Sequence, residues 1–173
     1  SFPTKDLYNK VSFSIEDNQH AVLIGSNGTG KTTLVQILMN PDEFLYEGKV
    51  KNNIEGRIGY VSQIEKADKQ RDITVFDFLA EDFVQLQTEM EAVCAEMETA
   101  EEFDTLMERY QQLLDESMAM DADHYESNIY KELKTAGLSE LADLSISIIS
   151  GGEYKLLQVI RQMLKKPALL IMD

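Results

Sequence analysis

The spacing of hydrophobic positions divides this chain of 173 residues into two kinds of pattern. In the first part, short apolar runs alternate with turns, which predicts β-strands over 11–15, 21–24, 48–51 and 57–62. A helical run over 33–39 separates the second of these strands from the third. The front of the chain is therefore expected to form a βαββ unit with an N-terminal hairpin.

The pattern becomes helical after Asp72. Seven apolar residues recur at alternating intervals of three and four, as in a heptad seam: Phe76, Leu79, Phe83, Leu86, Met90, Val93 and Met97. A capping-box sequence over 99–102 predicts the start of a second helix, whose apolar face continues from 103 to 118. We expect the two helices to pack as an antiparallel hairpin over about 76–120.

The remaining sequence predicts two more helices and a strand. One helix is expected over 127–136 and is closed by Gly137. Another is expected over 153–164 and is broken by Pro167. The continuous apolar run over 168–172 is typical of a buried strand in a parallel sheet, so the chain is expected to be α/β.

Composition indicates one ordinary domain without a membrane span. A hydrophobic content of 43% is enough for a core, and no apolar stretch approaches the roughly 20 residues of a spanning helix. The start of the sequence lacks the pattern of a signal peptide, and the single Cys94 fits a reducing compartment or simply a small apolar position on a helix. A cytoplasmic location is expected.

Charge is concentrated in one segment. The net charge is −15, and residues 81–126 hold fifteen acidic residues and one basic residue, Arg109, which gives −14. The rest of the chain is therefore close to neutral. An acidic segment of this kind disfavours contact with a phosphate backbone, and a solvated helical face is its simplest explanation.

The clearest candidate chemistry follows the second strand. Eight residues match G-x-x-x-x-G-K-[ST] without a gap: Gly25, Ser26, Asn27, Gly28, Thr29, Gly30, Lys31 and Thr32. Glycines permit a tight turn whose N–H groups face one concavity, and the next helix adds a partial positive charge. Lys31 would reach the β- and γ-phosphates and Thr32 would ligate Mg²⁺. The alternative is a chance glycine turn, which is disfavoured by the apolar run before the loop and the helical run after it.

Two later elements suggest the same kind of chemistry. Asp173 follows the apolar strand, where an aspartate can hold Mg²⁺, although any buried strand can end in Asp. Ser150-Gly151-Gly152 leads into a helix N-terminus, which is either an anion-binding surface or only an N-cap. His20 and His124 lack the spacing of a zinc site.

The order and spacing of these motifs resemble the ATP-binding-cassette (ABC) ATPases over the whole chain. In that resemblance, 25–32 is the Walker A motif, Gln63 the Q-loop glutamine, 149–153 the signature and 169–173 the Walker B motif. Phe2 falls where the family places the aromatic residue that stacks on adenine.

The resemblance implies a P-loop NTPase ABC cassette with an N-terminal antiparallel β subdomain and an inserted helical hairpin. It would divide into a nucleotide-binding part (1–72), a helical part (73–149), and the signature helix with the Walker B strand (150–173). Mg²⁺–ATP would be held by the Walker A residues with Thr33, by Phe2, and by Gln63 and Asp173 on the metal side. Ser150, Gly151, Gly152 and Glu153 would serve the nucleotide of a second, facing cassette.

The segment between Gln63 and Ser150 is longer than in most transporter cassettes, and Glu153 replaces the usual glutamine. Both features resemble the N-terminal cassette of ABC-F proteins, which bind ribosomes and act in translation or antibiotic resistance. The alternative is the ATP-binding subunit of a membrane transporter, whose partner is a permease. A non-catalytic nucleotide-binding module is a third possibility.

The catalytic Glu that the family places after Asp173 is not in this sequence. We therefore expect a truncated cassette that hydrolyses ATP in the intact protein but is inactive alone. Catalytic roles are expected for Lys31, Gln63 and Asp173.

Overall fold

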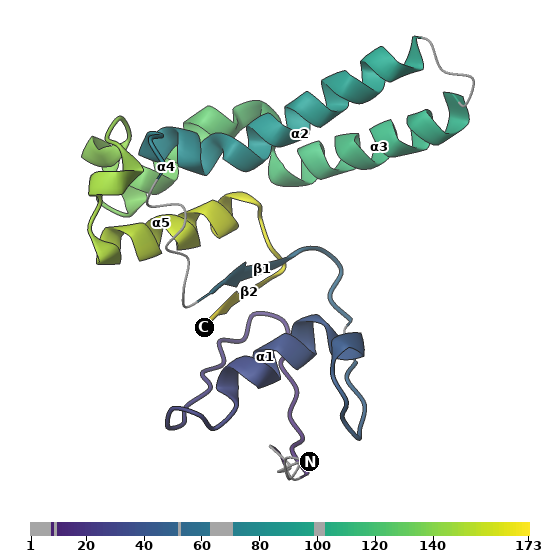
Figure 1. Ribbon diagram of the computed structural model, residues 1–173, viewed down its shortest axis with the longest axis vertical. Coiled ribbons are helices and arrows are strands. Elements are labelled where there is room, and N and C mark those ends of the chain that lie inside the picture. The colour runs from purple at the N-terminus through teal and green to yellow at the C-terminus, as the bar shows by residue number, and fades with distance from the viewer. Residues whose placement is uncertain (1–7, 9, 52, 63–70, 99–102) are drawn as a thin grey trace. The chain divides into compact units, whose positions relative to one another are not determined.

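The computed structural model describes residues 8, 10–51, 53–62, 71–98 and 103–173 (Figure 1). The chain forms two compact units, one of residues 1–53 with Asp173 and one of residues 54–172. Phe2, Gln63 and the capping box expected over 99–102 lie outside the described residues.

The described residues of the first unit form one α-helix, α1 (Lys31–Met39), and a short 3-10 helix, η1 (Pro41–Glu43). Helix α1 follows Gly30 and ends at Asn40, directly before the proline that cannot continue it. The helix agrees with the sequence expectation, although none of its residues is fully buried.

The strands expected over 11–15, 21–24 and 48–51 are not formed, so the prediction of an N-terminal antiparallel β subdomain was wrong for the described residues. Val22 and Ile24 are 83% and 88% exposed. A strand is stabilised by a ladder of hydrogen bonds to a neighbour, and among the described residues no segment pairs with these runs. Apolar alternation alone is not enough to form the element.

The second unit has a parallel two-stranded sheet of β1 (Ile58–Val61) and β2 (Leu169–Met172). Ile58 pairs with Leu169, and the Ala168 N–H donates to the Arg57 carbonyl at 2.8 Å. The expected strands over 57–62 and 168–172 are thus confirmed, and their parallel pairing with each other is a finding that the sequence did not predict. β2 is only half-buried, however, whereas its apolar run predicted full burial.

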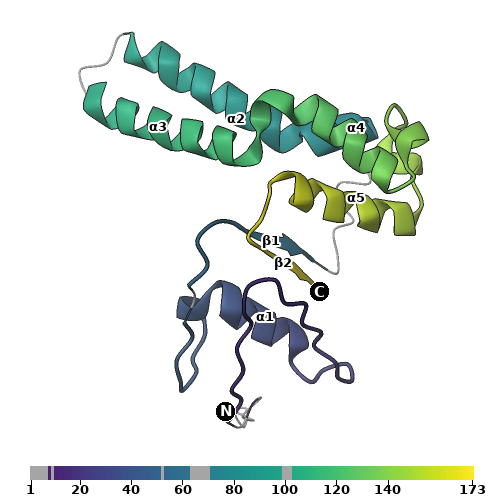
Figure 2. The ribbon, with the colours of Figure 1, turned by 180° about the vertical axis from the view of Figure 1, so that it is seen from behind.

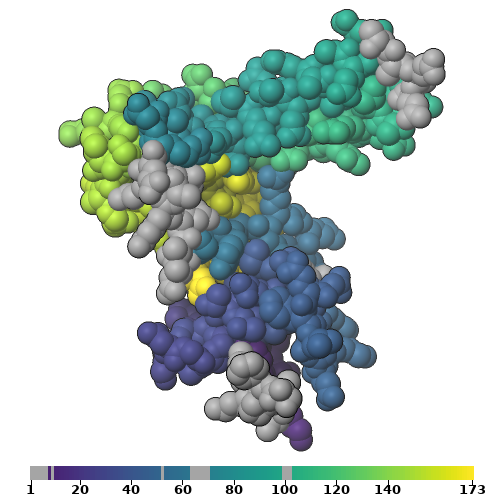
Figure 3. All heavy atoms as spheres, viewed as in Figure 1, coloured from purple at the N-terminus to yellow at the C-terminus, as the bar shows by residue number. Residues whose placement is uncertain are grey.

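Two long helices, α2 (Val75–Met97) and α3 (Phe103–Met120), run side by side in opposite directions in both views (Figure 1, Figure 2). Thr74 caps α2, since its hydroxyl accepts from the Asp77 N–H at 3.0 Å. The heptad seam is buried at Leu79, Phe83, Leu86 and Val93. The start of the seam packs on α4 (Tyr125–Thr135), since Phe76 contacts Tyr130 and Phe83 stacks on Tyr125. The space-filling view shows this hairpin as the elongated teal and green part of the helical unit (Figure 3).

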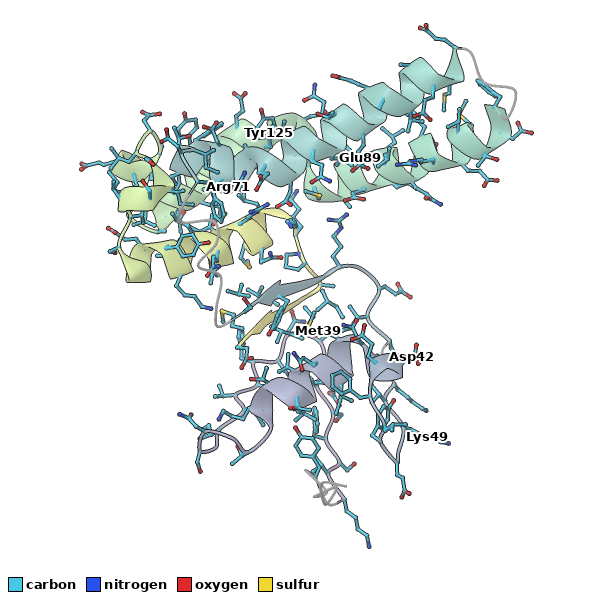
Figure 4. All side chains as sticks on the ribbon, in the orientation of Figure 1. Met39, Asp42, Lys49, Arg71, Glu89 and Tyr125 are labelled. Carbon is cyan, nitrogen blue, oxygen red and sulfur yellow. The ribbon has the colours of Figure 1, made fainter. Side chains whose placement is uncertain are left out.

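Helices α4 (Tyr125–Thr135) and α5 (Gly151–Leu164) pack against α2 and complete the unit, together with 3-10 helices at Ala122–His124, Ser139–Leu141 and Ile146–Ile148. The largest core side chains that are less than 2% exposed come from α2, α3, α4, α5 and the 3-10 helix at Ile146–Ile148: Val75, Phe78, Leu79, Met120, Ile129, Leu133, Ile146 and Leu157. Tyr125 stacks on Phe83 with ring centroids 5.3 Å apart (Figure 4). No helix in the described part of the chain is both long and apolar enough to cross a membrane.

Candidate functional site

The glycine-rich loop has the backbone of a phosphate cradle. Gly28 and Gly30 have φ angles of +80° and +95°, which other residues adopt only at a cost. A side chain at Gly25 would place its Cβ 2.9 Å from the Thr29 hydroxyl oxygen. Three of the loop's glycines are therefore required by conformation or by close packing.

The side chain of Lys31 lies back along the loop. Its ammonium donates to the carbonyls of Gly25 at 2.8 Å and Ser26 at 2.9 Å, and the Thr29 hydroxyl donates to the Ser26 carbonyl at 2.8 Å. An ammonium has three N–H donors, so the third remains to bind a phosphate oxygen. The lysine thus links the start of the loop to the start of α1.

The N-terminus of α1 supplies further donors. The N–H groups of the first turn have no intrahelical acceptor, and they belong to Lys31, Thr32 and Thr33. The first turn contains no acidic residue that would oppose an anion. Hydroxyl and carboxylate oxygens suit Mg²⁺, so Thr32 and Asp173 have the ligand chemistry that the sequence assigned to them.

Tyr8 is a contact that sequence reasoning missed. Its hydroxyl donates to the carbonyl of Gly30, and burial raises the pKa of Tyr8. No motif pointed to it, because a tyrosine 22 positions before a P-loop glycine has no pattern of its own.

The signature segment begins α5 with a capping box. The Ser150 hydroxyl accepts from the Glu153 N–H at 3.3 Å, and the Glu153 carboxylate accepts from the Ser150 N–H at 2.9 Å. Gly151 and Gly152 are exposed, and a Cβ on either would meet nothing within 4 Å. The N-cap interpretation therefore holds, and the Glu153 carboxylate lies in the first turn of α5.

An ion-pair network fixes the signature helix to α2. Arg161 of α5 donates to Asp82 at 2.8 Å and 3.2 Å, and its Nη2 lies 3.0 Å from Glu81. Lys165 lies 2.9 Å from Asp82, and Arg71 pairs with Glu81 (Figure 4). Burial alone would raise the pKa of Asp82, but hydrogen bonds from Arg161 and Lys165 hold it below its usual value. The hydrogen bond from Arg71 likewise lowers the pKa of Glu81.

The predicted site residues fall into three groups. Residues 25–33 lie together in the first unit, and 150–153 lie together in the second. Asp173 directly follows β2 and is grouped with residues 1–53. Phe2 and Gln63 lie outside the described residues, so their assignments stay predictions.

Comparison with known proteins agrees with this set of motifs. Residues 8–173 match the protein family described as "ABC transporter". A probable metal transport system ATP-binding protein of Thermotoga maritima is 29% identical over 97% of this chain and 55% of its own length. The zinc import ATP-binding protein ZnuC of Hydrogenovibrio crunogenus is 26% identical over 100% of this chain and 56% of its own length.

A third relative is longer. The uncharacterized ABC transporter ATP-binding protein YfmM of Bacillus subtilis is 28% identical over 99% of this chain but only 34% of its own length. The chain thus spans about half the length of the two metal-transport relatives and about a third of YfmM.

Proposed function

The chain belongs to the ABC transporter family of ATP-binding domains, and from this premise we propose that it binds Mg²⁺–ATP and, in the intact protein, hydrolyses it while paired with a second cassette. The observation that carries the proposal is the glycine-rich loop, where Lys31 bridges two loop carbonyls and α1 begins directly behind it. Bound Mg²⁺ would neutralise charge on the β- and γ-phosphates.

Within this proposal each part of the chain has a task. Residues 25–33 hold the phosphates, and Thr32 and Asp173 supply oxygen ligands for the metal. Phe2 stacks on adenine and Gln63 lies on the metal side. The exposed N-terminus of α5 at 150–153 completes the nucleotide site of the facing cassette.

A nucleotide titration tests the proposal. Lys31→Ala should weaken Mg²⁺–ATP binding by the intact chain at least about tenfold, because it removes a charge-assisted hydrogen bond. Lys49→Ala, at an exposed lysine of the same unit, is the matched control and should bind like the wild type (Figure 4). Equal affinities for the Lys31→Ala protein and the wild type would overturn the assignment.

For the whole protein, the relatives support the ATP-binding subunit of a membrane transporter, with a permease as partner and metal ions as the transported class. The names printed for the Thermotoga and Hydrogenovibrio proteins refer to metal transport and zinc import. The comparisons therefore favour the transporter interpretation over the ABC-F interpretation that the sequence first suggested. The subunit would work in the cytoplasm, where ATP is available.

One observation keeps the ABC-F interpretation as a second candidate. The α2–α3 hairpin is about 35 Å long by helix geometry, and its outer surface is acidic. Such a hairpin suits a contact arm, and a ribosome would then be the partner. Because the acidic charge disfavours a phosphate backbone, the arm would meet a basic protein of the ribosome or fit by the shape of its tip.

Co-sedimentation separates the two candidates. The full-length protein is expected to fractionate with membranes that contain its permease and to stay out of ribosome pellets. ATP-dependent recovery with purified ribosomes, lost on deletion of the hairpin, would instead establish the ABC-F candidate. The match to YfmM, which is much longer than this chain, makes this control worth including.

A further inference from the structure

A hydrogen bond from outside the motif reaches the glycine-rich loop. The Tyr8 hydroxyl donates to the carbonyl oxygen of Gly30, and the same carbonyl accepts from the Leu34 N–H at 2.9 Å. Both lone pairs of this oxygen are therefore engaged. Tyr8 is itself half-buried, in a stretch of the chain where most described residues are exposed.

The Gly30 carbonyl is connected to the phosphate cradle through one peptide group. That carbonyl and the Lys31 N–H belong to the same planar trans unit, so they point in opposite directions. A donor that fixes the oxygen on one side also fixes the direction of the N–H on the other. The Lys31 N–H belongs to the first turn of α1, where an anion would bind.

Two donors hold this peptide group, the Leu34 N–H of α1 and the Tyr8 hydroxyl from outside the helix. Gly30 has φ 95° and ψ 10°, and a glycine can leave this conformation for many others at little cost. The N-cap of α1 also has no side-chain hydrogen bond of its own. A hydroxyl on the carbonyl therefore limits rotation of the group that presents the Lys31 N–H.

We propose that Tyr8 is a positioning residue for the phosphate cradle, holding the Gly30–Lys31 peptide so that the Lys31 N–H faces the triphosphate. The inference rests on the proposed function of nucleotide binding. Burial raises the pKa of Tyr8, so the phenol stays protonated and remains a donor at neutral pH. Hydrogen bonding to the carbonyl also polarises the amide and strengthens its N–H as a donor.

The test compares Tyr8→Phe with Tyr46→Phe in the intact chain. Both substitutions remove only a hydroxyl, and Tyr46 is 41% exposed in the same unit. Tyr8→Phe should weaken binding of Mg²⁺–ATP and of inorganic tripolyphosphate by the same factor of about three to ten, the worth of one hydrogen bond. The ¹H–¹⁵N amide resonance of Lys31 should shift without ligand, and Tyr46→Phe should change neither quantity.

Other outcomes distinguish failure of the positioning role from failure of the proposed function. If the wild type binds and Tyr8→Phe binds equally well, the positioning role fails while the proposed function stands. A loss confined to ATP, with tripolyphosphate unaffected, would mean that Tyr8 acts on the base or ribose, and this also overturns the inference. If the wild type binds neither ligand, although Tyr8→Phe still shifts the Lys31 amide resonance, the proposed function fails. The positioning of a phosphate cradle by Tyr8 is then overturned as well.

Discussion

The two units of this chain show how differently strong sequence patterns turn into structure. Every fully buried hydrophobic residue in the described part of the chain belongs to residues 54–172, where Phe78 and Leu79 are almost inaccessible. In residues 1–53 the apolar side chains of Val22 and Ile24 are largely exposed. Both units have clear hydrophobic patterns in their sequences, but only in residues 54–172 do the apolar side chains pack into a buried core.

The difference follows from where each element makes its hydrogen bonds. A helix satisfies its backbone within one segment, so α2 and α3 need only pack their seams against a neighbour that follows in sequence. A strand needs hydrogen-bond partners on another segment, and β1 finds them in β2, whereas no described segment pairs with 11–15, 21–24 or 48–51. The glycine-rich loop forms without such a partner strand, because its glycine conformations, the contacts of Lys31 and the start of α1 are all local.

The largest effect expected from this contrast is in the core. Leu79→Ala should lower the free energy of unfolding of the helical unit by about 2–5 kcal/mol, because the side chain is 0% exposed and leaves a cavity. Ile24→Ala, at a side chain that is 88% exposed, should change it by less than about 0.5 kcal/mol. Urea denaturation of both variants measures the two values. Similar losses would mean that residues 21–24 are packed in solution, and the two units would then not differ in the burial of their apolar side chains.

The next effect concerns the network that holds the signature helix. Asp82→Asn should cost about 2 kcal/mol at pH 7, because it leaves Arg161 and Lys165 partly buried without their carboxylate. The pKa of Asp82 is lowered in the folded state, so its contribution is complete above the unfolded value of 3.8 and is lost as pH falls through the lower folded value.

The cost of Asp82→Asn should therefore shrink below about pH 4. Exposed Glu96 on the same helix gives the control, since Glu96→Gln should change the free energy of unfolding by less than about 0.5 kcal/mol. A cost for Asp82→Asn that stays constant from pH 7 to pH 2.5 would show that packing, rather than charge, is what the substitution removes.

These contrasts also explain what the sequence could predict. The heptad seam, the capping residue Ser150 and the stop at Pro167 all act within a few residues, and the structure has α2 and α5 close to where the pattern placed them. The strands over 57–62 and 168–172 were predicted too, because each is bounded by turn or proline signals.

The rest depended on contacts that leave no local pattern. Arg161 and Asp82 are 79 positions apart, and Tyr8 and Gly30 are 22 positions apart, so neither pair could be recognised from spacing. The failed strands in the first unit have the same cause, since alternation describes one strand and says nothing about its neighbour. The Walker A motif could be predicted because its residues are consecutive in the sequence.

A smaller effect distinguishes two kinds of glycine in the helical unit. Gly137 closes α4 with φ +73°, and the N–H groups of Gly137 and Leu138 donate to the Lys134 and Leu133 carbonyls at 3.1 Å and 2.8 Å. Gly137→Ala should destabilise the unit by about 1 kcal/mol through backbone conformation alone, since an added Cβ would meet nothing within 4 Å.

Gly151→Ala is the matched comparison for this glycine, because its site is equally open but helical. It should be neutral or stabilising by up to about 1 kcal/mol. Thermal unfolding of the two variants should move in opposite directions. Destabilisation of both would mean that the first turn of α5 is not helical in solution.

The smallest effect is at the surface, where α3 meets the strands. Arg57, just before β1, pairs with Glu116 of α3, and both side chains are more than one-third exposed. Arg57→Glu or Glu116→Arg alone should cost about 0.5 kcal/mol, and the double exchange should recover most of it. A double-mutant cycle by urea denaturation measures the coupling, which should fall further in 1 M salt because exposed charges are screened. A coupling of several kcal/mol that does not fall with salt would mean that this pair is desolvated like a core contact. Ion pairs would then stabilise the helical unit as much as the apolar residues of the heptad seam do.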